Sequence, residues 1–510
     1  MRSILPAIAL VLFSAGGARA GQPPKAPPAT VTDAPAAYYF MLGRHLEDAD
    51  KIDDAIAAHK KAIELEPESA ELRAELAALY ARQDRAREAL LMAEAALQRD
   101  PANREGNRVL GSIYAALSEQ RRPLRPGDDP SQYSAKAIAA LEKSRRDTGF
   151  DVNLELMLGR LYLNAHDYDK AIANLRRVVD DQPGYPEGAM LLSAAQEAGG
   201  SVPDAIATLE NVLEYAPTFV RAQVRLAELY DQERRYKEAA ATYARAAANT
   251  RIDLTARRAA ALINAGDVAE ARKLLEDAVK KKTPADAGVL YTLSQAQRRM
   301  KDFDAAALTA QQLKAAYPDD PRATYLNAQL LRDRGRTAEA ITAFQELIKR
   351  APQDGGLTYE YAALLERAGR LPEAERVLRD QLSKDPLDAN ALNSLGYLLA
   401  EHAQRLDEAV DLVQRALKVE PENPSFLDSL GWAYFQQGKI ELADPVLTKA
   451  AERLPSSSTV QDHLGDLRFR QQRFADAAAA WERSLAGDGE SIDRAKVEKK
   501  MRDARSRVKR

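Results

Sequence analysis

Cysteine is absent from the 510-residue sequence, and histidine, tryptophan and the other aromatic residues are scarce. Without cysteine the chain forms no disulfide and offers no thiol for lipid attachment behind an export signal. The few histidines are scattered and show none of the short spacings that hold a metal ion, so we assign them to surface or packing positions. They are His45, His59, His166, His402 and His463. We therefore predict no metal site and no cofactor.

A strong positive charge is also missing. Lysine and arginine total 73 against 76 aspartate and glutamate residues, which gives a net charge of −3 and a pI near 6.1. Nucleic-acid-binding domains usually carry a basic patch and a high pI. The charge balance therefore predicts that the partners of this chain do not include nucleic acid.

An apolar run lies at the N-terminus, shortly after a basic residue. Residues 4–15 are mostly apolar, follow Arg2 and precede a small-x-small cleavage site at 18–20. The run is shorter than the ~20 residues that a spanning helix needs, so 1–20 is predicted to be a cleaved signal peptide. Residues 21–35 are rich in proline and are predicted to form an extended linker. Export of a large helical chain without cysteine indicates a bacterial periplasm, with no transmembrane span after cleavage.

A 34-residue unit, clearest at 424–457, repeats along the rest of the chain. Leu430 and Gly431 lie on one face of a first helix, Gly438 breaks that helix, and Pro455 stops a second one. The stop proline recurs as Pro67, Pro101, Pro183, Pro217, Pro318, Pro352, Pro386, Pro421 and Pro455. An alanine at position 20 marks each unit: Ala55, Ala89, Ala137, Ala171, Ala205, Ala239, Ala271, Ala306, Ala340, Ala374, Ala409, Ala443 and Ala477. We predict thirteen helical hairpins that stack because none buries its faces alone.

This pattern resembles the tetratricopeptide repeat family, whose unit has leucine at position 7, a small residue at 8, alanine at 20 and proline at 32. The resemblance implies an all-α solenoid, a right-handed superhelix of about 13 helix-turn-helix repeats with a concave groove. Units 1–6 are expected at 36–251, with an insertion loop at 118–134, and units 7–13 at 252–491. A basic capping helix or tail is expected at 492–510.

Several departures from the repeat predict local features. Arg251 stands where a stop proline is expected and Arg258 replaces a core leucine, so the array is either rigid or hinged near Arg251. One extra residue falls near 402–405, and Pro445 should kink its helix or mark its first turn. The loop 118–134 is either a docking site or a solvated linker. The tail is either a cap alone or a cap that also meets an anionic lipid, polymer or protein.

No constellation of residues predicts catalysis. The glycine pairs lie in turns and lack the surroundings of a phosphate-binding loop, and acidic pairs are expected by chance where 29% of residues are charged. Thirteen units also leave no room for a catalytic domain. We therefore predict no catalytic residue. An enzyme with an unrecognised site in the groove is the alternative from another functional class.

A stripe of aromatic residues lies on the helix face that lines the groove in the family. Its members recur at positions 5, 9 and 12 of successive units: Tyr291, Tyr325, Tyr359, Tyr397, Trp432, Phe435 and Phe469. Rigid aromatic side chains suit the binding of an extended peptide or a partner's helix. The alternative is that these side chains wedge between repeats as part of the core. The family's clamp for a C-terminal carboxylate is not matched.

These observations predict a protein-protein interaction scaffold that binds partner proteins or peptides in the groove. The segments LNSLGYLLAE, RLDEAVDLVQRAL and FLDSLGWAYF resemble large exported repeat proteins of proteobacterial envelopes. That resemblance implies an adaptor for a periplasmic processing protease, although many such relatives are lipoproteins and this chain has no cysteine. An assembly component of an exopolysaccharide-export or outer-membrane machine is the alternative.

Overall fold

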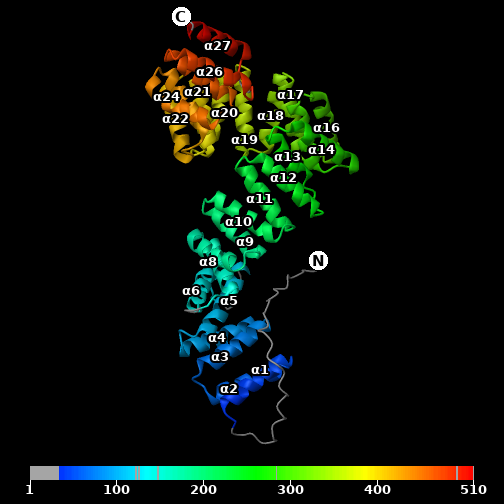
Figure 1. Cartoon of the computed structure of the whole chain (residues 1–510), viewed down its shortest axis with the longest axis vertical. Helices are drawn as coiled ribbons and strands as arrows, with labels where there is room; N and C mark the ends of the chain where they lie inside the picture. The colour runs from blue at the N-terminus through cyan, green and yellow to red at the C-terminus, as the bar shows by residue number, and fades with distance from the viewer. Residues whose placement is uncertain are drawn as a thin grey trace. The chain divides into compact units, whose positions relative to one another are not determined.

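The computed structural model of the chain describes residues 34–120, 123, 127–145, 149–282, 284–489 and 492–508. The predicted signal peptide and nearly all of the predicted linker lie outside these residues. The chain divides into two compact units, the first ending at Ala265 and the second beginning at Gly266. Across the described ranges the regular structure is helical and contains no strand (Figure 1). No helix in these ranges is both long and apolar enough to cross a membrane.

The first unit contains helices α1 to α13, stacked in chain order (Figure 1). Their bounds are α1 Ala36–Asp48, α2 Ile52–Leu65, α3 Ala70–Arg82, α4 Ala86–Arg99, α5 Arg104–Gln120, α6 Tyr133–Lys143, α7 Val152–Asn164, α8 Tyr168–Asp181, α9 Pro186–Ala198, α10 Val202–Tyr215, α11 Val220–Gln232, α12 Tyr236–Ala248 and α13 Thr255–Asn264. A short 3-10 helix, η1 (Pro130–Gln132), precedes α6 within the insertion.

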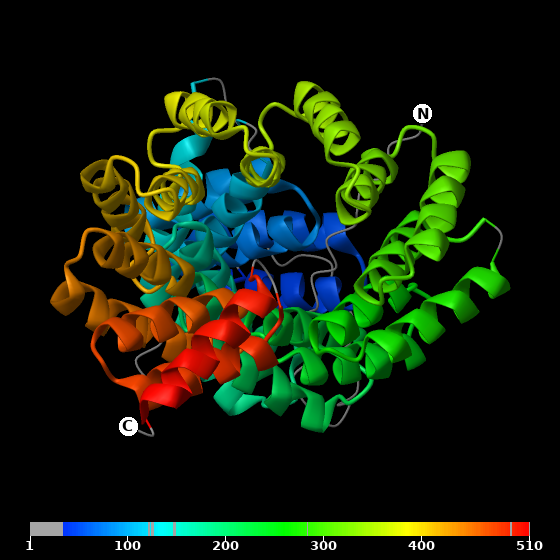
Figure 2. The ribbon, with the colours of Figure 1, turned by 90° about the horizontal axis from the view of Figure 1, so that it is seen from above.

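The second unit contains helices α14 to α27, which follow one another around a curved stack (Figure 2). Their bounds are α14 Val268–Lys281, α15 Ala287–Arg299, α16 Phe303–Ala316, α17 Pro321–Asp333, α18 Thr337–Arg350, α19 Gly355–Arg367, α20 Leu371–Lys384, α21 Ala389–Glu401, α22 Leu406–Val419, α23 Pro424–Gln436, α24 Ile440–Arg453, α25 Ser458–Arg470, α26 Phe474–Ala486 and α27 Arg494–Val508.

Each odd-numbered helix up to α25 is the first helix of a repeat, here the A helix, and the following even-numbered helix is its B helix. The order confirms the prediction of an all-α solenoid of thirteen helix-turn-helix repeats. The division between the compact units falls at the turn between α13 and α14, inside the seventh repeat, whereas the predicted boundary lies at 251. A hinge near Arg251 stays a prediction.

Within each compact unit, the core of a repeat depends on small residues where its two helices meet. All thirteen alanines at position 20 have no accessible surface. Opposite them, the position-8 glycines lie so close to the B helix that a side chain would collide. A Cβ on Gly431 would lie 2.5 Å from Leu447 Cγ, and one on Gly159 would lie 2.4 Å from Leu175 Cγ. The two helices of these repeats therefore approach each other closely.

The extra residue predicted near 402–405 lies in the turn between α21 and α22. Ala403 and Arg405 both have positive φ angles, 48° and 40°, which are unfavourable for residues with a Cβ. The corresponding turn of the next repeat contains Gly438 at φ 78°. The longer turn therefore contains two strained non-glycine residues, whereas the turns of other repeats have a single positive-φ residue, which is glycine in some (Gly369, Gly438) and not in others (Asp84, Lys301).

Two other irregular positions are also visible. Pro445 is the sixth residue of α24 and lies inside the helix, beyond its first turn. In the insertion, Tyr133 is fully buried, stacks on Tyr114 at 5.5 Å and donates a hydrogen bond to Asp128 at 2.9 Å. These contacts fix the end of the insertion nearest α6. Docking of a partner on the loop stays a prediction.

Helix α27 covers the last repeat. Val497 and Ala504 are buried against α26 in a cluster with Trp481. Lys500 reaches the A helix of that repeat, where its Nζ lies 3.0 Å from Asp462 Oδ1 and 2.7 Å from Asp466 Oδ2. The end of the solenoid thus has an apolar contact and an ion-pair contact with this basic helix.

Candidate partner-binding surface

The predicted aromatic stripe lies on the A helices of the second unit, α15, α17, α19, α21, α23 and α25, whose shared surface we call the A face. Aspartate side chains cap the N-termini of several of these helices. Asp320, Asp354 and Asp388 each accept a hydrogen bond from a backbone N–H in the first turn of α17, α19 and α21. Such caps satisfy N–H groups that have no partner within the helix. These A helices therefore begin at one register in successive repeats.

The three predicted tyrosines occupy equivalent, half-buried positions on α15, α17 and α19. The Tyr325 hydroxyl donates to Glu360 of the next repeat. The Tyr359 hydroxyl donates to both oxygens of Asp388, at 2.6 and 2.5 Å, also in the next repeat. Burial and these carboxylates raise the pKa of both phenols well above the usual range. Two of the three tyrosines thus join adjacent repeats.

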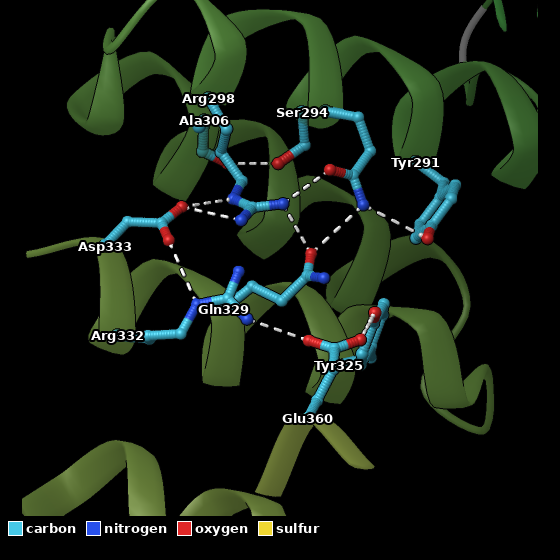
Figure 3. Close-up of polar contacts among 10 residues, drawn as sticks. Tyr291, Ser294, Arg298, Ala306, Tyr325, Gln329, Arg332, Asp333 and Glu360 are labelled. Atoms are coloured by element: carbon cyan, nitrogen blue, oxygen red, sulfur yellow. Dashed lines mark hydrogen bonds and ion pairs between the residues drawn. The ribbon is translucent and has the colours of Figure 1, made fainter. Parts of the chain in front are cut away.

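Tyr291 instead joins a polar network between α15, α17 and α19 (Figure 3). Its hydroxyl accepts a hydrogen bond from Gln295 Nε2 at 3.1 Å. In the same network Arg298 bonds Asp333 at 2.6 Å, and Arg332 bonds Glu360 at 2.8 Å (Figure 3). Each ion pair connects one repeat to the next. The network therefore orients side chains along the A face across three repeats.

Tyr397, Trp432 and Phe435 come together in a second cluster, at the centre of which is a histidine. Trp432 is 8% exposed and lies between two parallel rings, Phe435 at 5.0 Å and His463 at 4.0 Å between centroids. The indole Nε1 donates to Glu401 Oε2 at 2.8 Å. Tyr397 lies 6.2 Å from the His463 ring. The cluster thus contains residues from three consecutive A helices, α21, α23 and α25.

Phe469 belongs to neither group. It is half-buried on α25 and contacts Phe474 and Trp481, with ring centroids 5.3 and 5.7 Å away. The Arg507 guanidinium of α27 lies over the ring at 4.8 Å. Phe469 therefore contributes to the contact between the last repeat and its covering helix.

Acidic residues are prominent on the C-terminal part of the A face. Glu366, Glu401, Asp428, Asp462 and Asp466 come from four A helices, and their basic neighbours are Arg367, His402, His463 and Lys500. Burial raises the pKa of the Glu366 carboxyl despite the adjacent His402. Burial likewise raises the pKa of Asp466 despite Lys500. Carboxylates therefore outnumber cations on this surface.

Two hollows of the described second unit lie away from the stripe. One of about 840 Å³ is bounded by α24 and the end of α25, including Asp444, Pro445 and Arg468. Another of about 310 Å³ lies between α16 and α17, beside Ala310 and Asn327. None of the seven predicted aromatic residues lines either hollow. The A face is thus a surface of half-buried side chains, and its binding of a partner stays a prediction.

The contacts of the stripe were not evident from the sequence. Glu360, Asp388 and Glu401 hold the aromatic hydroxyl and indole groups, and each lies in the repeat before or after the residue that it binds. In the sequence, an acidic residue about one repeat before or after each aromatic residue is a signal for such hydrogen-bonded pairs. The sequence assigned His463 to a surface or a packing position, and the side chain is packed in the interior.

Two family models, both described as tetratricopeptide repeat, match the sequence over most of its length. One matches residues 198–263, 262–330 and 331–396, and the other matches 40–104, 156–211, 371–425 and 429–492. The chain belongs to the tetratricopeptide repeat family. Neither tetratricopeptide repeat model describes a catalytic domain, and the described residues contain no group of three or more potential metal ligands.

Three solved structures are similar to this tetratricopeptide repeat chain. One is a tetratricopeptide repeat protein from Parabacteroides merdae, with 16% identity, a TM-score of 0.40 and coverage of 49% of this chain and 97% of its own. Yeast Tom70 has 16% identity and a TM-score of 0.35, with 93% of this chain and 96% of its own covered. YrrB, described as having an unusual peptide-binding site, has 20% identity and a TM-score of 0.33, with 37% of this chain and 90% of its own covered. A search of curated proteins found no match.

Proposed function

We propose that this protein is a non-enzymatic scaffold that binds partner proteins or peptides along the A face of its second unit. The observation that carries the proposal is that aromatic side chains recur on six consecutive A helices and most remain half-buried. Aromatic groups that keep part of their surface exposed supply contact area at a low cost in conformational entropy. The hydrogen bonds of Tyr325, Tyr359 and Trp432 to neighbouring repeats hold these side chains in place before a partner arrives, which reduces the entropy lost on binding.

The charge of the surface favours one kind of partner segment. Because carboxylates outnumber cations on the C-terminal part of the A face, a segment carrying lysine or arginine meets a complementary potential. The half-buried aromatic rings favour an extended peptide or an amphipathic helix with apolar side chains between the basic ones. We therefore expect a basic, partly apolar segment to bind across α19, α21, α23 and α25.

Site-specific photocrosslinking tests the surface and captures the partner in the same experiment. A photoreactive phenylalanine analogue at Ala363 or Asn390, both exposed on A helices, should crosslink to a partner. The same analogue at Leu308 or Leu442, exposed on the B helices α16 and α24, serves as the matched control. Crosslinks from the A-helix positions alone support the proposal, and crosslinks from the B-helix positions alone contradict it.

The cellular role is part of the proposal and rests on the sequence. The apolar N-terminal segment and the resemblance of the last repeats to proteobacterial envelope proteins support a periplasmic scaffold within an envelope complex. Within that setting we propose an adaptor for a processing protease. An alkaline phosphatase fused after residue 36 should be active only if the N-terminal segment directs export. An inactive fusion contradicts periplasmic export.

A component of an exopolysaccharide-export or outer-membrane assembly machine is the second candidate for the pathway. Deletion of the gene distinguishes it from the adaptor. If the adaptor role is correct, particular envelope proteins become longer-lived in the deletion strain, and the crosslinked partners include a protease. Crosslinks to glycan-export proteins, without change in protein lifetimes, favour the second candidate.

A further inference from the structure

His463 lies at a junction of three repeats and is almost completely enclosed. The residue is 5% exposed, and its Nδ1 lies 3.0 Å from each carboxylate oxygen of Asp428, a residue that is also 5% exposed. The imidazole stacks on Trp432 with an interplanar angle of 11°. Tyr397 and Glu401 come from α21, Asp428 and Trp432 from α23, and His463 from α25. The cluster around this one side chain therefore joins three successive A helices.

The charge state of this histidine has consequences for its neighbours. A buried carboxylate is costly unless a positive charge or several hydrogen-bond donors accompany it. A protonated His463 supplies that charge to Asp428 at 3.0 Å. It also places a cation against the Trp432 ring, at 4.0 Å between centroids, where the aromatic face attracts positive charge. Deprotonation removes both attractions together.

The titratable groups around the pair are mostly acidic. Glu401 and Tyr397 face it from α21, Asp462 and Asp466 share α25 with it, and Glu366 on α19 lies near Tyr397. Lys500 of α27 is the neighbouring cation and is bound to Asp462 and Asp466. Burial disfavours the charged imidazole, but Asp428, with Glu401 and Asp462, outweighs burial and raises the pKa of His463.

We propose that His463 is a protonation-dependent lock that holds repeats 11, 12 and 13 together and thereby regulates the A face. In the protonated state the imidazolium pairs with Asp428 and stacks on Trp432, so α21, α23 and α25 stay packed together. In the neutral state the Asp428 carboxylate loses its counter-charge and the three helices separate more readily. The effect on partners rests on the proposed function, whereas the lock itself does not.

The direction of the pH dependence follows from the raised pKa. An unfolded histidine titrates near 6.5, and the folded one titrates at higher pH. The contribution of the lock is therefore complete below about pH 6.5 and is lost as the pH rises through the folded value. The C-terminal repeats should open more readily in mildly alkaline solution than in mildly acidic solution.

Histidine NMR of the full chain tests the lock directly. With 13C-labelled histidine, the signal of His463 is assigned by its loss in His463→Gln, and its pH titration is then followed. We expect a midpoint above 6.5 in the natural protein and a lower midpoint in Asp428→Asn, because the carboxylate charge that raises the pKa of His463 is then removed. A midpoint at or below 6.5, or one that is unchanged in Asp428→Asn, overturns the proposal.

Hydrogen exchange of the same proteins tests the structural consequence. Between about pH 6 and pH 8.5, normalised exchange of α23 and α25 should accelerate in the natural protein. His463→Gln should lack this pH dependence. His402→Gln is the matched control, because His402 pairs with Glu366 at 3.0 Å on a more exposed part of the face and should leave the dependence intact. Equal pH dependence in all three proteins overturns the lock.

A binding measurement separates this proposal from the proposed function. The probe is a synthetic peptide of alternating lysine and leucine residues, measured by anisotropy at about pH 6 and pH 8.5. We expect weaker binding at the higher pH for the natural protein and little pH dependence for His463→Gln. If His463 titrates as expected but no A-face ligand is found, the proposed function fails and the lock stands. If A-face binding is found but the His463 midpoint is normal, the lock fails and the function stands.

Discussion

Tyr359→Phe removes a single hydroxyl from a contact between two repeats and leaves the ring in place. That hydroxyl donates to both oxygens of Asp388 at 2.6 and 2.5 Å. Asp388 keeps two other donors, Gln381 Nε2 at 2.8 Å and the backbone N–H of Ala391 at 2.9 Å. A hydrogen bond to a charged group contributes about 1.5–3 kcal/mol. Because Tyr359 is half-buried and Asp388 retains partners, we expect a loss near the lower limit, about 1.5 kcal/mol.

Hydrogen exchange measured by mass spectrometry is the appropriate assay, because a long repeat array need not unfold in a single step. A local loss of about 1.5 kcal/mol corresponds to roughly tenfold faster exchange in the affected helices. The effect should appear in α19 and in the first turns of α21. Tyr215→Phe is the control, since Tyr215 is 61% exposed and such a surface change costs less than about 0.5 kcal/mol.

The same variant should show a defined pH dependence. Burial tends to raise the pKa of Asp388, but the hydrogen bonds from Tyr359 and Gln381 lower it overall. A carboxylate with a lowered pKa stabilises the fold above its unfolded value of about 3.9, and this contribution is lost as pH falls through the folded value. The difference between Tyr359→Phe and the natural protein should therefore shrink below about pH 3.9. Exchange rates equal to those of Tyr215→Phe at neutral pH would refute the reasoning.

Two further substitutions test the packing and the irregular turn. Gly465→Ala should lower stability by about 1–3 kcal/mol, because its Cβ would lie 2.4 Å from Trp481 Nε1; unchanged exchange in α25 and α26 would contradict this. Ala403→Gly should raise stability by about 1 kcal/mol, because Ala403 is exposed and has a φ of 48°; a lower melting temperature would show that the turn is not strained.

The fold was predictable because the residues that specify each helical hairpin lie within that hairpin. Ala443 at position 20 and Pro455 at position 32 report a helix-helix contact and a helix end that depend only on residues within one hairpin. The same applies to Gly431, whose absent Cβ permits the approach of Leu447. Local periodicity thus specified the helix pairs and their number, although it contained no information on how the two compact units are arranged.

The contacts of the candidate site were less predictable because they form between repeats. Tyr325 binds Glu360, 35 residues later, while Tyr359 binds Asp388, 29 residues later. The separations differ because Glu360 lies within α19 whereas Asp388 caps the start of α21, and the periodicity does not report which position of the next repeat supplies the partner. His463 was assigned a surface or packing role, but its pairing with Asp428 emerged only from the stacking of α25 on α23.

The most direct test of the A face is a hydrogen-exchange footprint of the full chain with the partner identified by crosslinking. Protein with and without that partner is compared helix by helix. We predict that binding slows exchange in the A helices α19, α21, α23 and α25 and leaves the B helices α20, α22, α24 and α26 nearly unchanged. Protection confined to the B helices, or to the first unit, would contradict the assignment of the A face as the partner-binding surface.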